Sequence, residues 1–234
     1  MEVLPLPIRP GAGNTQNASS LFGIEPPKML HGIDSTAPRS NSYPVLPVTH
    51  PAPANRCLAF WKLFSTRDLP ELGVGPRLDA MALGPLETAL DRFRREAQLE
   101  PDQSLRLRAA TLLYHDHHDA AHDIVQDLQD TEAAMIHAIL HRREPDYWNA
   151  KYWFRRFDAH PVYRSLGRRL PSLVVTASEA EMARRLTLPG PFDPFAFVDL
   201  CESHEKCPAN DAGVAWLRRV QHAEFEELAA HLLA

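Results

Sequence analysis

Apolar residues recur three and four positions apart through most of the chain after residue 80, and this helical spacing limits the fold more than any other feature. In GPLETALDRFRREAQL, the residues that share one helix face are Leu86, Leu90, Phe93 and Ala97. A second stripe, near the C-terminus, consists of Leu217, Val220, Phe225, Leu228 and Leu232. Only SLVVTAS (172–178) resembles a strand, and one strand cannot form a sheet. The sequence therefore predicts an all-α fold.

The predicted helices follow one another closely in the middle of the chain. They cover residues 104–114, 118–128, 131–143 and 147–157, and Asp193 before Pro194 has the pattern of a further helix start. A weak repeat places Asp116, Ala120 and Ile124 thirty residues before Asp146, Ala150 and Phe154. This spacing resembles the tetratricopeptide pattern, although the diagnostic Trp and Gly are missing. We expect stacked antiparallel helical hairpins, either tetratricopeptide-like or as an irregular bundle.

Prolines divide the chain into two regions. Ten of the 21 prolines precede Asn55, in a segment that is also rich in Ser, Asn and Gly and has no periodic apolar pattern. Such a composition is typical of disorder. We expect residues 1–54 to be a disordered tail and residues 55–234 to be a single helical domain, with the apolar segment NRCLAFWKLFS packed against it.

Charge and hydropathy exclude several classes of partner. The formal net charge is −5 and no long basic run is present, so nucleic acid is not the expected partner. The sequence contains no stretch of about 18 apolar residues, so no membrane span is expected. The N-terminus lacks the pattern of a secretion signal, so a cytoplasmic protein is expected. The cysteines in CESHEKC, Cys201 and Cys207, match no common zinc module and are interpreted as ordinary thiols.

Six of the twelve histidines lie between positions 115 and 141. His118 and His122 are four residues apart, as are His137 and His141, so each pair shares a helix face. In an antiparallel hairpin that turns at QDLQDT, His122 lies opposite His137 and His118 lies opposite His141. The same register places His115 opposite Glu144.

This convergence predicts a metal site. Divalent transition ions take three or four imidazole or carboxylate ligands from more than one element, as in helical-bundle metal sites. Three carboxylates beside the histidines are potential ligands or hydrogen-bond acceptors: Asp116, Asp119 and Asp123. Two other interpretations remain open, a hydrogen-bonded polar seam between packed helices and a solvated helix face.

The segment HRREPDYWNAKYWFRRFDAHPVY is the most basic part of the predicted domain and is rich in aromatic residues. Pro145 ends one predicted helix, and Asp146 caps the next. Arg142 and Arg143 beside a metal would suit a pocket for an organic anion, because a guanidinium group binds carboxylates. Solvated arginines and structural aromatic residues are the alternative.

The stretch LLYHDHHDAAH…IHAILHRREPDYWNAKYWFRR…HPVY resembles a family of small bacterial and fungal proteins, largely without an assigned activity. The resemblance covers about residues 85–232. It implies an all-helical domain whose signature includes the run 142–146 and the positions His115, Asp119, His122, His137 and His141. It favours His115 over His118 as a ligand.

Together these observations favour a metal-dependent enzyme that acts on a small organic acid or ester. We expect a divalent transition ion (zinc, iron or manganese) held by His115, His122, His137 and His141. Glu144 or Asp119 is the expected general base, and Arg142 or Arg143 the expected anion ligand. Hydrolysis or elimination suits zinc, whereas iron or copper would allow oxygenase chemistry. The alternatives are a helical-repeat interaction module without catalysis and a metal-free enzyme that uses a His–Asp pair.

Overall fold

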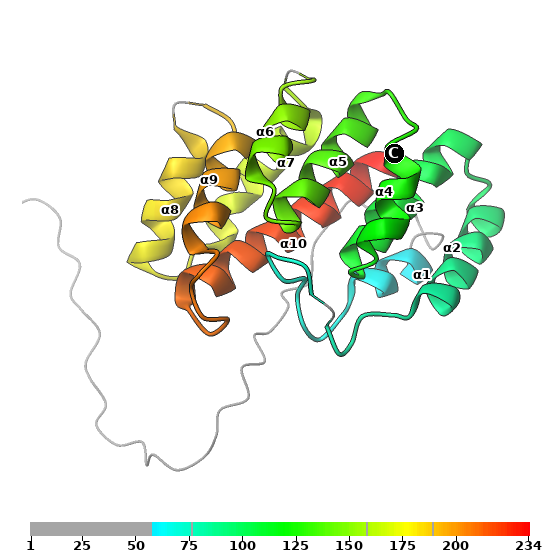
Figure 1. Ribbon diagram of the computed structural model, residues 1–234, viewed down its shortest axis with the longest axis horizontal. Coiled ribbons are helices and arrows are strands. Elements are labelled where there is room, and N and C mark those ends of the chain that lie inside the picture. Colours follow the sequence, from blue (N-terminus) through cyan, green and yellow to red (C-terminus); the bar gives the residue numbers. More distant parts are fainter. Residues whose placement is uncertain (1–57, 76, 158, 189) are drawn as a thin grey trace, which may run out of the picture. The chain divides into compact units, whose positions relative to one another are not determined.

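Helices make up all the regular secondary structure of residues 58–75, 77–157, 159–188 and 190–234, the residues that the computed structural model describes (Figure 1). The predicted all-α fold is therefore confirmed, whereas the predicted disordered tail, residues 1–54, lies outside the described residues. In chain order the elements are α1 (Leu58–Trp61), η1 (Lys62–Phe64), α2 (Leu83–Ala97), α3 (Pro101–Tyr114), α4 (His118–Val125), α5 (Thr131–Arg143), α6 (Tyr147–Phe154), α7 (Pro161–Arg169), η2 (Leu170–Leu173), α8 (Ala177–Thr187), α9 (Pro194–His204) and α10 (Ala212–Leu232).

The long C-terminal helix α10 forms the centre of the helical domain. It packs against α3, α7, α8 and α9, and Figure 1 shows it running behind the hairpins as the red helix. Every residue of its predicted apolar stripe is buried, and so are polar residues on its other faces, including Gln221 and Glu224. Residues 220–226 are all buried, so the middle of α10 is buried on all sides, as in a core helix rather than an amphipathic surface helix.

The middle of the chain forms the stacked antiparallel hairpins that the sequence predicts. Helix α3 packs on α4, α4 on α5, and α5 on α6. The small residue of the second repeat copy, Ala150, is fully buried where α6 meets its neighbours. The small methyl side chain of Ala150 allows the backbones of α6 and its neighbour to approach closely. The histidine-bearing helices α4 and α5 are neighbours in the same stack.

Capping residues fix most helix starts where the sequence places them. The side chains of Asp130, Asp146 and Asp193 each accept a backbone amide hydrogen bond in the first turn of α5, α6 and α9. Helices α4 and α6 end three residues earlier than predicted, at Val125 and Phe154.

The strand-like segment 172–178 is not a strand. It begins inside η2 and ends in the first turn of α8. Thr176 and Glu179 form a reciprocal capping box, in which each side chain accepts a hydrogen bond from the other residue's backbone amide. The local capping bonds therefore outweigh the β-propensity of the two valines.

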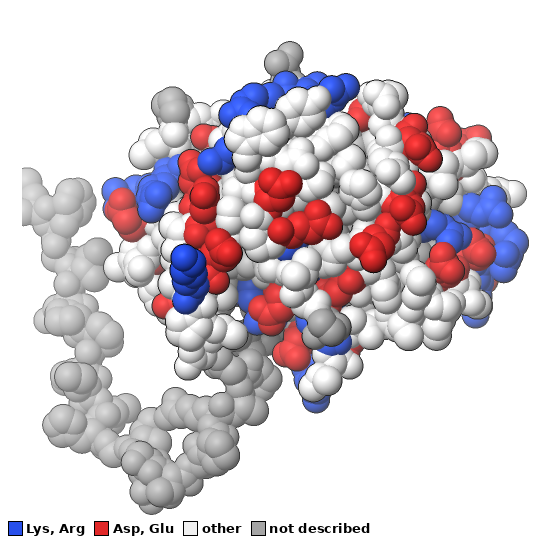
Figure 2. Space-filling model, in the orientation of Figure 1, with Lys and Arg blue, Asp and Glu red and all other residues white. Residues whose placement is uncertain are grey.

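The apolar segment NRCLAFWKLFS packs on the helical domain as predicted, over the part that is described. Phe60, Leu63 and Phe64 are buried, and the ring of Phe60 lies 5.1 Å from that of Phe93 in α2. On the face seen in Figure 2, carboxylates are spread across the middle and Lys and Arg gather toward the edges. No helix within the described ranges is long and apolar enough to cross a bilayer.

Candidate metal centre

Three histidines from two helices converge where α4 packs on α5. His137 and His141 are one turn apart on α5, and His122 reaches them from the last turn of α4. The ring of His122 lies 4.8 Å from that of His137 and 5.8 Å from that of His141. One potential ligand atom from each of the three residues lies within 4.8 Å of the other two. We call this set the α4–α5 histidine group.

Burial has left two of these rings with unused nitrogens. His137 and His141 are buried, and the Nδ1 atom of each has no hydrogen-bond partner. Two carboxylates lie near His141 Nδ1, that of Glu144 at 3.2 Å and that of Asp146 at 3.9 Å, but neither forms a hydrogen bond with it. Unpartnered buried polar atoms cost free energy, so a ligand that satisfied these nitrogens would stabilise the group.

The surroundings of His137 and His141 favour the neutral form of both rings. Burial, followed by the neighbouring His141 and His122, lowers the pKa of His137 to about 3. Burial also lowers the pKa of His141 below its usual range. A metal ion requires an unprotonated imidazole nitrogen, so these shifts favour ligation over protonation at neutral pH.

Glu144 lies at the edge of the group. Burial, together with the nearby Asp119 and Asp146 carboxylates, raises the pKa of Glu144 above its usual range, against the opposing effect of His122. A higher pKa makes this carboxylate a better proton acceptor near neutral pH. Asp119 is exposed in the first turn of α4, so it is close enough to influence Glu144 but is not among the clustered ligand atoms.

His115, the fourth expected ligand, lies apart from this group. Its Nε2 atom is 2.9 Å from the carbonyl oxygen of Leu63, and its Nδ1 atom accepts a hydrogen bond from the Met81 amide. Both ring nitrogens of His115 therefore form hydrogen bonds to the backbone of the segment before α2. His115 is the C-cap of α3, and Asp116 has a positive φ of 67°, so the chain turns before α4 begins. This turn breaks the register that places His115 opposite Glu144.

His118 also lies outside the group, although it belongs to α4. Its Nδ1 atom is 3.2 Å from the Asp116 carbonyl oxygen, and its buried Nε2 atom has no partner. The predicted pairing of His122 with His137 is therefore present, whereas His141 meets His122 and His137 rather than His118.

Arg142 was expected to bind a substrate anion, but the structure buries it completely. Its guanidinium group forms an ion pair with Glu224 of α10, donates a 3.3 Å hydrogen bond to Gln221 and lies 4.2 Å from the centre of the Phe197 ring. A solute cannot reach this group from outside. Arg142 instead joins α5 to α10 and α9.

Arg143 is buried just as completely. It donates a 2.7 Å hydrogen bond to Asp116, a 3.1 Å hydrogen bond to the carbonyl oxygen of Glu71 and another to that of Leu113. The guanidinium group therefore fixes the turn between α3 and α4. No signal in the sequence distinguishes this role from anion binding, because the partners are up to 72 residues away.

Two neighbours of the histidine group come from α6. The Trp153 ring stacks on His137 at 3.9 Å, and the Asn149 side-chain amide donates to His141 Nε2 at 3.1 Å. Rotation of that amide would present its oxygen instead, so Asn149 can orient His141 in either tautomer. Arg156 is exposed and lies 5.2 Å from the Trp153 ring. Unlike Arg142 and Arg143, Arg156 is therefore an exposed cation next to Trp153.

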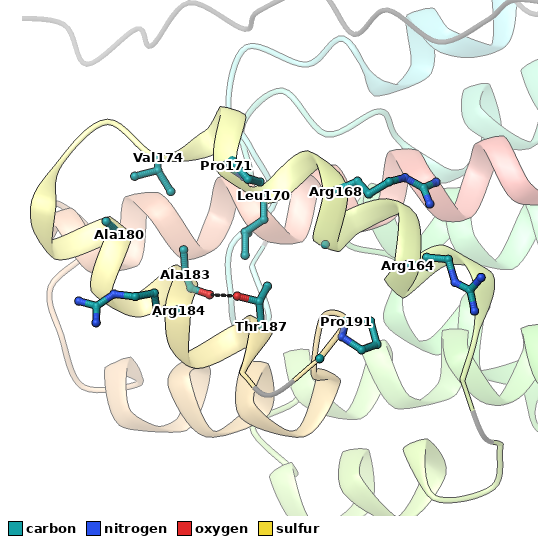
Figure 3. Close-up of a pocket in the computed structure, with 12 residues that line it drawn as sticks. Arg164, Arg168, Leu170, Pro171, Val174, Ala180, Ala183, Arg184, Thr187 and Pro191 are labelled. Carbon is teal, nitrogen blue, oxygen red and sulfur yellow. Dashed lines mark hydrogen bonds between the residues drawn. The ribbon is translucent and has the colours of Figure 1, made fainter.

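A groove of about 570 Å³ between α7 and α8 lies elsewhere in the domain (Figure 3). Leu170, Pro171 and Ala183 line its apolar floor, and Arg164 and Arg184 lie at its margins. None of its lining residues is a histidine or a carboxylate. It offers no ligand to a metal ion and contributes no residue to the α4–α5 histidine group.

No protein-family model matches the chain, and no curated protein or solved structure matches it either. The resemblance of the histidine and arginine signature to a bacterial and fungal family therefore stays a prediction.

Proposed function

We propose that the protein is a metal-dependent enzyme of the hydrolase or lyase type, with a divalent transition ion held by His122, His137 and His141. The observation that carries the proposal is the convergence of three imidazoles whose ligand atoms lie within 4.8 Å of one another, two of them with unpartnered buried nitrogens. Three protein ligands with one further position open are typical of catalytic zinc sites.

Glu144 is the proposed proton acceptor. It is half-buried beside His141, and its raised pKa suits a group that takes a proton from water or substrate near neutral pH. A bound divalent ion would supply Lewis acidity toward a carbonyl oxygen or a water molecule. Asp119 supports this role by raising the pKa of Glu144, and is not itself the proposed base.

The proposed substrate is a small organic acid or ester. Since Arg142 and Arg143 are buried, the exposed Arg156 beside Trp153 is the proposed contact for a substrate anion. Trp153 would provide a flat apolar surface next to the metal ligand His137.

Metal content is the first test. We expect untagged wild-type protein to bind at least one equivalent of zinc, iron or manganese, and His122→Ala and His137→Ala each to lose one equivalent by elemental analysis. His118→Ala is the matched control, because His118 belongs to the same helix as His122 but lies outside the histidine group. Circular dichroism of all three variants checks that they fold.

Catalysis is the second test, with p-nitrophenyl acetate as the probe ester. Hydrolysis should be lost after chelation and restored by added zinc, and Glu144→Gln should lower the rate about 100-fold while keeping the metal. Wild-type protein that binds no metal at any pH would refute the proposal, and so would histidine variants that lose stability but no metal. The histidines would then form a polar seam.

One observation favours the interaction module as a second candidate. Trp148 is 73% exposed and stacks on Tyr152 at 6.1 Å, so α6 presents aromatic rings to solvent. Exposed aromatic residues are typical of protein-binding surfaces. Trp148→Ala should leave metal content and ester hydrolysis unchanged if the two functions are separate, whereas a loss of hydrolysis would place Trp148 in the substrate site.

A further inference from the structure

A second set of potential metal ligands gathers at the other end of α5. Glu132 lies in its first turn, His160 is the N-cap residue of α7, and His231 lies in the last turn of α10. One ligand atom from each lies within 4.8 Å of the other two. Residues from three elements, up to 99 positions apart, are thus brought together without any residue of the α4–α5 histidine group.

The contacts within this set leave one buried nitrogen unused. His231 Nε2 lies 3.3 Å from a Glu132 carboxylate oxygen, and the His160 and His231 rings are 5.0 Å apart. His160 is only 3% exposed, and its Nε2 atom has no hydrogen-bond partner. A buried polar atom without a partner, next to a second imidazole and a carboxylate, points to a ligand between them.

A cavity of about 360 Å³ adjoins the three side chains. Besides the three, its lining residues are Thr131, Arg156, Phe157, Ala159 and Pro161. The ligand set therefore has an open side with room for water or a small solute, and Arg156 supplies a positive charge at that side.

We propose that Glu132, His160 and His231 bind a second divalent transition-metal ion, of the zinc class, with an open position toward this cavity. Two histidines and one glutamate are an established donor set for catalytic zinc. Ligand atoms around a tetrahedral ion at 2.0–2.2 Å are about 3.4 Å apart. The separations in the set, at most 4.8 Å, require only small side-chain rotations to reach this value.

Metal binding at His160 would have a specific structural consequence. The Nδ1 atom of His160 accepts a 3.2 Å hydrogen bond from the Val162 amide, so the single proton of the neutral ring resides on Nε2. When Nε2 binds the ion, it releases its proton to water and Nδ1 takes up a proton from water, so the ring stays neutral with its proton on Nδ1. The Nδ1–H group of His160 and the backbone N–H group of Val162 then face each other, so the N-cap hydrogen bond of α7 is lost.

The site can be tested apart from the first one in full-length, untagged His122→Ala protein. Titration with zinc chloride should show one remaining equivalent, and Glu132→Gln or His231→Gln in this background should weaken it at least tenfold. His160→Asn is the sharpest variant, because asparagine caps a helix as well as any residue but removes the imidazole ligand. Unchanged zinc affinity in Glu132→Gln and His160→Asn, with folding confirmed, would overturn the proposal.

Hydrogen exchange gives an independent readout. Zinc should accelerate exchange of the Val162 amide at least tenfold in the His122→Ala background, and should have no such effect in the variant that also carries His160→Asn. Zinc binding without faster exchange at Val162 would refute His160 as the ligand. The same measurement distinguishes the two proposed sites. If His122→Ala protein binds no zinc, the second site alone is refuted. If it binds as much zinc as wild type, the site at His122, His137 and His141 is refuted.

Discussion

At the scale of single residues, buried charges have structural partners that lie far away in the sequence. Arg142 and Glu224 are both fully buried, and the Tyr163 hydroxyl donates a 3.2 Å hydrogen bond to the same carboxylate. The positive charge of Arg142 and the Tyr163 hydroxyl thus satisfy Glu224 within an apolar core. Removal of one partner leaves an uncompensated buried charge, which costs more than the intact pair contributes.

Arg142→Met should therefore destabilise the protein by about 3–5 kcal/mol, measured by urea unfolding. The double variant Arg142→Met, Glu224→Gln should recover much of this loss, because the unpaired carboxylate is then neutral. A role for Arg142 in substrate binding would instead give a higher KM with unchanged stability. That result would contradict the burial of the guanidinium group.

At the scale of the secondary-structure elements, local signals define the helix starts. The Asp146 carboxylate accepts a 3.3 Å hydrogen bond from the backbone amide of Asn149 and so caps α6. The same helix carries Trp153 and Asn149, which contact His137 and His141. A loosened first turn of α6 would therefore affect the histidine group as well as the stability of the helix.

Asp146→Ala should cost about 0.5–2 kcal/mol through loss of the cap, measured by urea unfolding. Asp146→Asn is the matched control, since asparagine retains the capping oxygen but removes the charge 3.9 Å from His141. Equal stability of wild type and Asp146→Ala would remove the capping role. Destabilisation by both variants would show that the charge matters more than the hydrogen bond.

At the scale of the whole molecule, several buried histidines make the fold sensitive to acid. Burial lowers the pKa of His115, His118 and His160 to about 4 and that of His137 to about 3. In the unfolded chain, each imidazole titrates near 6.5. The unfolded state therefore binds more protons below this pH, and the folded state loses stability as the pH falls.

The free energy of unfolding should be nearly independent of these histidines above pH 7, and should decrease steadily from about pH 6.5 to 4. Urea unfolding of chelator-treated protein at several pH values measures this slope, free from any contribution of bound metal. His115→Gln should make the slope shallower, because glutamine can replace both hydrogen bonds of His115 but does not titrate. A slope that stays the same in this variant would contradict the lowered pKa of His115.

The sequence by itself determined the helical class, most helix starts and the pairing of His122 with His137. These features follow from the spacing of apolar residues and from capping side chains, which act within a few positions along the chain. The resemblance to a family added His115 as a ligand, which the structure places apart from the other three.

Only the tertiary structure decided which charged and imidazole groups meet. The turn at Asp116 separates His115 from α4, and the buried middle of α10 gives Arg142 its partner Glu224. The set of Glu132, His160 and His231 has no local signature at all. Helix packing angles and long-range ion pairs depend on the complementarity of whole surfaces, and this complementarity leaves no periodic trace in the sequence.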